Sequence, residues 1–314
     1  MKKILITGAT GFVGKYLVDY IAKNSQDKVY GTYISDSPDK RDQIEFVKID
    51  LNNEQDVQNM VGEIKPDYVY HLAALSSASD SFKHPKETII NNVSVQVNLL
   101  EAIKKHELKE TKILIISSAE IYGMVDPKDL PINEKTELNP TNPYAVSKIT
   151  QDFLALQYYL AFNLKTFRVR PFNHTGPGQR PDFVVSAFAK KIAEIEKGKR
   201  EKVMTVGNLE TKRDFTDVRD IVEGYAAVME KGKIGEVYNM GSGKSHKISE
   251  ILEIFISLST EKIEVKEDPS LFRPFDDPDL VCDADKIKKD TGWEPQIPLN
   301  KTLKDTLDYW RNII

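Results

Sequence analysis

The chain has 314 residues, of which 40% are hydrophobic, a formal net charge of −4 and one cysteine, Cys282. This length and composition favour one large domain or two unequal ones and exclude a largely disordered chain. Basic residues are interleaved with acids, which argues against a nucleic-acid-binding surface, and a single cysteine excludes an intrachain disulfide.

The first residues, "MKKILITGATGFVG", place two lysines before an apolar run. The run is short and broken by glycines, and no small-residue cleavage site follows, so it predicts a strand rather than a signal peptide. No later stretch approaches the roughly 18 apolar residues of a membrane span. We therefore expect a cytoplasmic protein that does not contact a membrane.

Short apolar runs alternate with longer helical patterns through the first half of the chain. The runs predict strands at 2–7, 28–33, 44–49, 67–74, 112–117 and 164–170. Between them, apolar residues recur three and four apart, which predicts helices at 14–23, 54–64, 94–106 and 147–162. Such alternation is typical of parallel βαβ units, so we expect an α/β fold with a Rossmann-type doubly wound parallel sheet.

The regular alternation of strand and helix patterns ends after about Pro171. Helices are predicted at 183–198, 219–232, 248–259 and 299–312, separated by loops and by short strands such as 236–241. We expect residues 1–170 to form the sheet domain and residues 171–314 to form mainly a smaller, helix-rich lobe, with the chain free to cross between the two. The loops 126–143 and 267–279 are long enough to carry function.

The first strand is followed by a glycine-rich turn with Gly8, Gly11 and Gly14. Glycines at a strand-to-helix turn let the backbone approach a pyrophosphate, whose charge then meets the amide end of the helix. Residues 1–170 are therefore expected to bind NAD(P). Asp50 and Leu51, after the third strand, lie where an adenine would be held.

The end of the second strand normally separates NAD from NADP, because an acid there binds the ribose hydroxyls and an arginine suits a 2′-phosphate. This chain has Tyr33 and Ile34 at that end, followed by Asp36, Lys40 and Arg41. Asp36 lies beyond the strand end, farther along the chain than an acid that binds the ribose. Lys40 and Arg41 reach a phosphate only if the loop folds back. The sequence leaves the cofactor preference open.

The segment "NPYAVSK" places Tyr144 and Lys148 four residues apart, on one helix face. A lysine ammonium beside a phenol is expected to lower the pKa of the phenol, and the same lysine can hold a cofactor ribose. Upstream, "SSAEIYG" puts Ser118 at the carboxyl end of a predicted strand, the edge where such sheets bind ligands. If the strand continues, Ser118 and Glu120 face the same side.

Together these motifs make the chain resemble the extended short-chain dehydrogenase/reductase (SDR) family, which acts largely on nucleotide-activated sugars. The segments "TGATGFVG", "HLAA", "SSAEIYG", "NPYAVSK", "RDFTDVRDIVEGY" and "YNMGSG" fall in the family's order over nearly the whole chain. Within it, "RPFNHTGPGQ", "VGNLETKRDFTDVRD" and "LFRPFDDPDL" look most like the GDP-4-keto-6-deoxy-D-mannose reductases. The GDP-mannose 4,6-dehydratases share many of these sequence motifs.

The resemblance implies the roles of the site residues. Ser118, Tyr144 and Lys148 are expected to be catalytic, with Glu120 as a further candidate, and His71 is expected to line the cofactor side. The cofactor is expected at Gly8, Thr10, Gly11, Phe12, Val13, Gly14, Asp50, Leu51, Leu72, Ala73, Ala74, Tyr144 and Lys148, and the sugar nucleotide at Asn173, Arg180, Arg213 and Arg273.

Arginine suits a nucleoside diphosphate sugar, because its planar fork matches phosphate oxygens in a way that lysine cannot. His174, beside Asn173, is expected to be structural, because Tyr144 already supplies a proton. No histidines or cysteines show metal-ligand spacing, so no metal site is expected. In the resembling family the helices corresponding to 91–106 and 147–163 pair in a homodimer, although burial in the monomer core explains part of their apolar surface equally well.

The resemblance implies an enzyme that reduces the 4-keto group of GDP-4-keto-6-deoxy-D-mannose with NAD(P)H, giving GDP-D-rhamnose. The main alternative is a 4,6-dehydratase, in which Glu120 takes the proton from carbon 5. A 4-epimerase of the same family also remains open. A non-catalytic nucleotide-sensing module is a different class, and the joint presence of Ser118, Tyr144 and Lys148 argues against it.

Overall fold

The computed structural model describes residues 1–35, 38, 43–272 and 278–314. Expectations for Asp36, Lys40, Arg41 and Arg273 fall outside these ranges. Within them, no helix is both long and apolar enough to cross a bilayer.

The centre of the molecule is a seven-stranded sheet in the order β10-β6-β5-β4-β1-β2-β3. Every strand pair in it is parallel. Because the order reverses between β1 and β4, this is the predicted doubly wound Rossmann-type sheet, with its ligand-binding edge at the carboxyl ends of the strands. The strands are β1 (Lys3–Thr7), β2 (Lys28–Tyr33), β3 (Ile44–Lys48), β4 (Tyr68–His71), β5 (Lys112–Ile116), β6 (Lys165–Pro171) and β10 (Val237–Met240).

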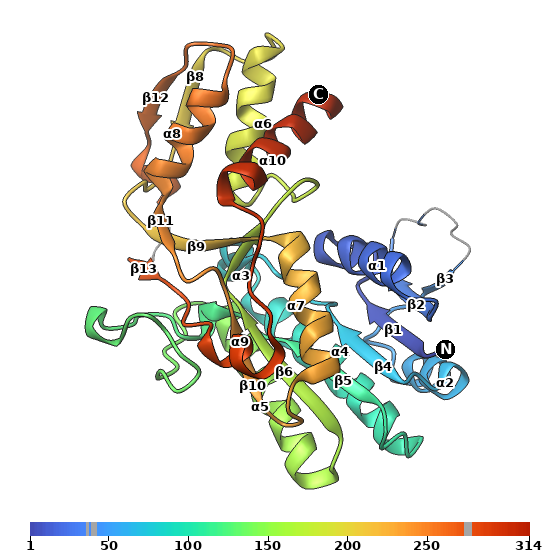
Figure 1. Cartoon of the computed structure of the whole chain (residues 1–314). Helices are drawn as coiled ribbons and strands as arrows, with labels where there is room; N and C mark the ends of the chain where they lie inside the picture. Colours follow the sequence, from blue (N-terminus) through green and yellow to red (C-terminus); the bar gives the residue numbers. More distant parts are fainter. Residues whose placement is uncertain (36–37, 39–42, 273–277) are drawn as a thin grey trace.

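Helices cover both faces of this sheet, as Figure 1 shows. Alternate strand residues face opposite sides, so Ile4 and Ile6 pack toward one helical layer and Leu5 toward the other. The first layer comprises α1 (Phe12–Asn24), α7 (Val218–Lys231) and α9 (Asp285–Thr291). The second comprises α2 (Glu54–Ile64), α4 (Pro85–Lys105) and α5 (Pro143–Phe162), with the short α3 (Ala78–Lys83) before α4.

A smaller lobe lies above the carboxyl edge of the large sheet (Figure 1). Its apolar core is formed mainly by α6 (Val184–Glu196), α8 (Ile248–Leu258) and α10 (Leu299–Ile313). Its strands are β7 (Asn173–Thr175), β8 (Val203–Val206), β9 (Lys212–Asp217), β11 (Ser245–Lys247), β12 (Glu264–Glu267) and β13 (Asp279–Leu280). Of these, β11, β9 and β13 form one sheet, with β7 also pairing with β9, while β12 pairs with β8.

The chain crosses between the lobes more than once. The sequence places the strand at 236–241 in the second half, yet β10 pairs with β6 of the large sheet. The helix before it, α7, packs against α1 through residues that include Val222 and Tyr225. An apolar helix face shows that a helix is buried, but not which lobe buries it.

Candidate active site

A cavity of about 590 Å³ lies at the carboxyl edge of the large sheet, between the two lobes. Most of the predicted site residues line it: Gly8, Gly11, Phe12, Val13, Gly14, Leu72, Ala73, Ala74, Ser118, Glu120, Tyr144, Lys148, Asn173, Arg180 and Arg213. Its walls therefore bring together the glycine turn, the turn after β5, the start of α5 and the segments around β7 and β9.

Thr10, Asp50, Leu51 and His71 do not line this cavity. The Leu51 side chain belongs to the core beneath the second helical layer. The exposed Asp50 carboxylate accepts hydrogen bonds from the backbone and side-chain nitrogens of Asn52. The adenine contact expected of Asp50 and Leu51 stays a prediction.

The glycine turn is a backbone cradle. Gly8 has φ +69°, and a Cβ on Gly14 would lie 2.2 Å from the carbonyl oxygen of Gly8, so a side chain at Gly14 would not fit. Gly11 is the N-cap of α1 and supplies no side-chain hydrogen bond to the first amides of the helix. An uncapped helix start beside a glycine turn fits a bound pyrophosphate, because its free amides carry partial positive charge.

The ends of β1 and β4 are joined beside this turn. The Thr7 hydroxyl accepts hydrogen bonds from the amides of Leu72 and Ala73, at 3.1 and 3.2 Å. It also lies 2.9 Å from Nδ1 of His71. Burial lowers the pKa of His71 to about 3, so the ring is neutral. His71 thus lies behind the cofactor side of the cavity and helps to fix the loop that forms its wall.

The turn after β5 differs from its prediction. The strand ends at Ile116, and Ser118 begins a 3₁₀ turn, η1 (Ala119–Ile121), with its hydroxyl accepting the amide of Glu120 at 3.2 Å. The expectation that Ser118 and Glu120 share one face of a continued strand is wrong, because the serine caps the turn instead. Both side chains still reach the cavity.

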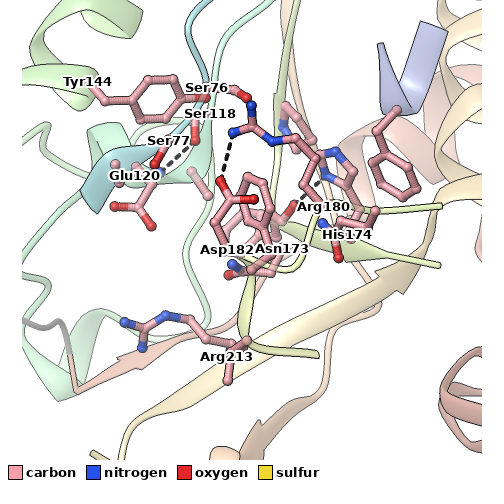
Figure 2. Close-up of a pocket in the computed structure, with 18 of the residues that line it drawn as sticks. Ser76, Ser77, Ser118, Glu120, Tyr144, Asn173, His174, Arg180, Asp182 and Arg213 are labelled. Carbon is pink, nitrogen blue, oxygen red and sulfur yellow. Dashed lines mark hydrogen bonds and ion pairs between the residues drawn. The ribbon is translucent and has the colours of Figure 1, made fainter. Parts of the chain in front are cut away.

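Tyr144 and Lys148 lie on the first two turns of α5, whose N-cap is Asn142 and whose first residue is Pro143. Both side chains are buried in the wall of the cavity, and in Figure 2 the Tyr144 ring extends toward Ser118. The Lys148 ammonium donates to the carbonyl oxygen of Ile116 and to Oε1 of Gln151, each at 2.8 Å. These contacts seat the lysine at the end of β5.

The predicted effect of Lys148 on the phenol is not found. Burial raises the pKa of Tyr144 above its ordinary value; a hydrogen bond with Ser118 lowers it, and the Glu120 carboxylate raises it further. The Lys148 Nζ atom is 5.8 Å from the centre of the tyrosine ring and is held by two other acceptors. Desolvation therefore outweighs the lysine, and Tyr144 is a protonated phenol at neutral pH.

Burial also lowers the pKa of Lys148 to about 7. Between pH 7 and the ordinary lysine value of 10.5, the unfolded chain holds a proton that the folded protein has lost, so Lys148 makes stability rise with pH in that window. We expect the free energy of unfolding of the wild type to gain about 2 kcal/mol from pH 7 to pH 9 relative to Lys148→Met. Urea unfolding of both proteins at the two pH values measures this difference. A difference that stays constant with pH would contradict a buried, readily deprotonated lysine.

Glu120 is fixed by the start of α5. The side-chain amide nitrogen of Asn142, Nδ2, donates to Oε2 of Glu120 at 3.0 Å. The Oδ1 atom of Asn142 accepts a hydrogen bond from the backbone amide of Ala145 at 2.8 Å. One side chain thus caps the helix that carries Tyr144 and also holds the carboxylate beside it.

The second lobe contributes Asn173, Arg180 and Arg213 (Figure 2). The Arg213 side chain is buried, and its guanidinium donates to the carbonyl oxygen of Lys212 at 2.7 Å. Arg180 is exposed and forms a 2.7 Å ion pair with Asp182. Two arginines therefore lie on the cavity wall opposite the glycine turn, which places positive charge where an anionic ligand would extend from the first lobe into the second.

His174 also lines the cavity, in the segment opposite the glycine turn. Its ring is parallel to that of Phe12, with centroids 6.4 Å apart, and Nδ1 is 3.1 Å from the carbonyl oxygen of Phe172. Burial lowers the pKa of His174. The His174 ring packs against Phe12, and its structural role stays a prediction.

Several lining residues had no sequence prediction: Ser76, Ser77, Ser79, Gln179, Asp182, Gly207, Asn208, Leu209, Thr211 and Leu271. The three serines could have been predicted from the sequence, because they come soon after β4, at the edge of the sheet where ligands bind. The others lie on loops of the second lobe, whose approach to the cavity depends on long-range packing. In the part of the chain that the structure describes, no three His, Cys, Asp or Glu side chains are grouped as metal ligands.

Known proteins resemble this chain over almost its full length. The family model described as GDP-mannose 4,6 dehydratase matches residues 5–306. A GDP-6-deoxy-D-mannose reductase from Pseudomonas aeruginosa is 32% identical, and the match covers 99% of this chain and 98% of the relative.

Solved structures share the fold as well. RMD from Pseudomonas aeruginosa, complexed with NADPH, has a TM-score of 0.88 and 30% identity, and the match covers both chains completely. A UDP-glucose 4-epimerase from Thermus thermophilus, complexed with NAD, has a TM-score of 0.87 and 26% identity, covering 99% of this chain and 100% of that one. The first of these structures contains NADPH and the second contains NAD.

Proposed function

Because this chain belongs to the GDP-mannose 4,6-dehydratase family of extended SDR proteins, we propose that it reduces GDP-4-keto-6-deoxy-D-mannose at carbon 4 with NAD(P)H, giving GDP-D-rhamnose. The observation that supports this most is the position of Tyr144. Its phenol is protonated at neutral pH and faces a cavity that joins a nucleotide-binding turn to two arginines. A reduction needs such a proton donor, because hydride addition to a ketone leaves an alkoxide.

The cofactor is held by the first lobe. The turn with Gly8, Gly11 and Gly14 and the free amides of α1 bind its pyrophosphate. An ammonium has three donors, and among the described residues Lys148 gives two of them to Ile116 and Gln151, which leaves one for a ribose hydroxyl. When bound, NAD(P)H supplies the hydride.

Three side chains carry out the remaining chemistry. Tyr144 donates its proton to the oxygen on carbon 4 as negative charge develops there. Ser118 donates a hydrogen bond to the same oxygen and stabilises that charge. Lys148 lies one helical turn from Tyr144, where the donor left over from its bonds to Ile116 and Gln151 holds the cofactor ribose beside the phenol.

The second lobe binds the sugar nucleotide. Arg213 and Arg180 are placed to pair with the diphosphate, and Asn173 with sugar hydroxyls. Arg180 must then exchange its ion pair with Asp182 for a phosphate contact, which is a modest cost for an exposed pair. We assign Arg273 the same role from sequence alone.

We also propose that the protein is a cytoplasmic homodimer formed through α4 and α5. Val146, Phe153 and Leu160 recur every seven residues along α5 and are exposed. Ile90 is exposed on α4, which packs beside α5. A second copy would cover this apolar stripe, and sedimentation of the purified protein measures whether it does.

A direct test supplies purified protein with GDP-mannose and, separately, with GDP-4-keto-6-deoxy-D-mannose plus NADPH or NADH. Loss of reduced cofactor in proportion to the keto sugar consumed supports the reductase. Conversion of GDP-mannose without net change in the cofactor would instead identify a 4,6-dehydratase and refute the proposal. The product sugar, identified by nuclear magnetic resonance, separates D-rhamnose from its carbon-4 epimer.

One observation favours the dehydratase as a second candidate. The Glu120 carboxylate lines the cavity close enough to raise the pKa of Tyr144, so a base is available for proton removal at carbon 5. We expect Glu120→Gln to change kcat for keto-sugar reduction by less than tenfold, that is by less than about 1.4 kcal/mol in activation free energy. Glutamine keeps an oxygen to accept from Asn142, so the local geometry survives. A loss as large as that of Tyr144→Phe would show that the carboxylate is required.

A further inference from the structure

A buried ion cluster lies behind the cavity, outside its lining. Asp152 of α5 is fully buried and accepts from two arginines of β6. Arg168 donates to Oδ1 at 2.8 Å, and Arg170 donates to Oδ2 at 2.9 Å and to Oδ1 at 3.3 Å. One arginine would neutralise the carboxylate, yet the protein buries two, which is costly unless the second guanidinium has another partner.

Arg170 has that partner. Its NH1 atom donates to the phenolic oxygen of Tyr122 at 2.9 Å and to the carbonyl oxygen of Glu134 at 3.2 Å. The Tyr122 hydroxyl in turn donates to Oδ1 of Asn239 on β10 at 2.7 Å. Arg168 differs, because its other guanidinium contact among the described residues is the carbonyl oxygen of Gly235 at 2.9 Å.

The two ends of the Arg170 guanidinium therefore contact the two elements that carry the proposed chemistry. Asp152 lies four residues after Lys148 and eight after Tyr144 on α5, so the three lie along one side of that helix. Tyr122 ends the 3₁₀ turn that Ser118 begins, and its amide donates to the carbonyl oxygen of Ala119. One side chain thus connects the helix of Tyr144 with the turn of Ser118.

We propose that Arg170 is a positioning residue that sets the distance between the Tyr144 phenol and the Ser118 hydroxyl. This inference rests on the proposed function, in which both groups act on the same substrate oxygen. Asn142 links the same two elements at the front of the site, through Glu120. Arg170 links them from behind, so that α5 and the turn are held at two separated points and cannot pivot about one.

The test compares Arg170→Met with Arg168→Met. Each variant leaves Asp152 with one arginine, so the two lose similar charge pairing, but only Arg170→Met loses the contact to Tyr122. We expect Arg170→Met to lower kcat for keto-sugar reduction by roughly 10²-fold, because a displacement of about 1 Å in a reacting group has that effect. We expect Arg168→Met to lower it less than threefold, with a similar loss in melting temperature. The dissociation constant for NADPH, measured by fluorescence, should remain within threefold in both.

Tyr122→Phe removes only the hydroxyl and carries the test if Arg170→Met fails to fold. We expect it to lower kcat by about tenfold or more, and the double variant Tyr122→Phe/Arg170→Met to be no slower than Arg170→Met alone, since both remove one link. Equal losses of kcat in Arg168→Met and Arg170→Met, or full additivity in the double variant, would overturn the proposal.

Crystal structures of the variants without substrate separate this inference from the proposed reaction. The Tyr144 Oη to Ser118 Oγ distance should lengthen in Arg170→Met and Tyr122→Phe and remain as in the wild type in Arg168→Met. An unchanged distance in Arg170→Met would refute the positioning role whatever the substrate is. A wild type that leaves the keto sugar unreduced, together with the lengthened distance, would refute the reductase and retain the role of Arg170.

Discussion

Tyr144→Phe is expected to lower kcat for keto-sugar reduction by about 10²–10⁴-fold, the usual contribution of a positioned proton donor. The phenol is buried in the cavity wall and protonated at neutral pH, so its loss removes the proton source from a site where water is a poor substitute. Stopped-flow or steady-state loss of NADPH absorbance with the keto sugar measures the effect.

The matched control is Tyr158→Phe, on the same helix. Its hydroxyl contacts Glu101, away from the cavity, so this variant should keep the wild-type rate. NADPH affinity should be similar in all three proteins, because the glycine turn is untouched. Unchanged turnover in Tyr144→Phe would refute the proton-donor role.

Gly14→Ala is expected to weaken NADPH binding by roughly 10²-fold, since the cofactor turn must move to admit the new methyl group. The added Cβ would lie 2.2 Å from the carbonyl oxygen of Gly8 and 2.8 Å from Cα of Ala9, and backbone atoms cannot yield cheaply. Fluorescence titration of NADPH measures the affinity, and thermal unfolding confirms that the variant is folded.

Gly11→Ala provides a graded comparison within the same turn. Its Cβ would lie 3.2 Å from the same carbonyl oxygen, a crowding that a small shift relieves. We therefore expect a smaller loss of affinity than for Gly14→Ala. The reverse order would show that close packing of α1 against Gly8 and Ala9 is not what Gly14 provides.

The parts of the site that the sequence predicts well depend on neighbours in the chain. The glycine turn needs only Gly8, Gly11 and Gly14 between a strand and a helix, and the Tyr144–Lys148 pairing needs only helical spacing. The parallel sheet follows from the alternation of apolar runs with amphipathic helices.

The predictions that failed depend on contacts far along the chain or on competing local bonds. The pKa of Tyr144 is set by burial beneath both lobes, which no local spacing reveals, so the expected lowering was wrong. Ser118 and Glu120 do not share a strand face, because the Ser118 hydroxyl accepts the Glu120 amide. The cluster around Arg170 was missed because Arg170 and its partners Asp152, Tyr122 and Glu134 come from four separate segments.

The return of β10 to the large sheet also has a consequence for how the protein is made. Val237–Met240 pairs with Arg168–Pro171, across an interval of nearly seventy residues that builds much of the other lobe. During synthesis, the nucleotide-binding half therefore leaves the ribosome with β6 as a bare edge, able to pair with other nascent chains until β10 emerges. A gene fragment that ends near residue 171 would keep that edge permanently, and we expect it to self-associate through β6 even though its cofactor motif is complete.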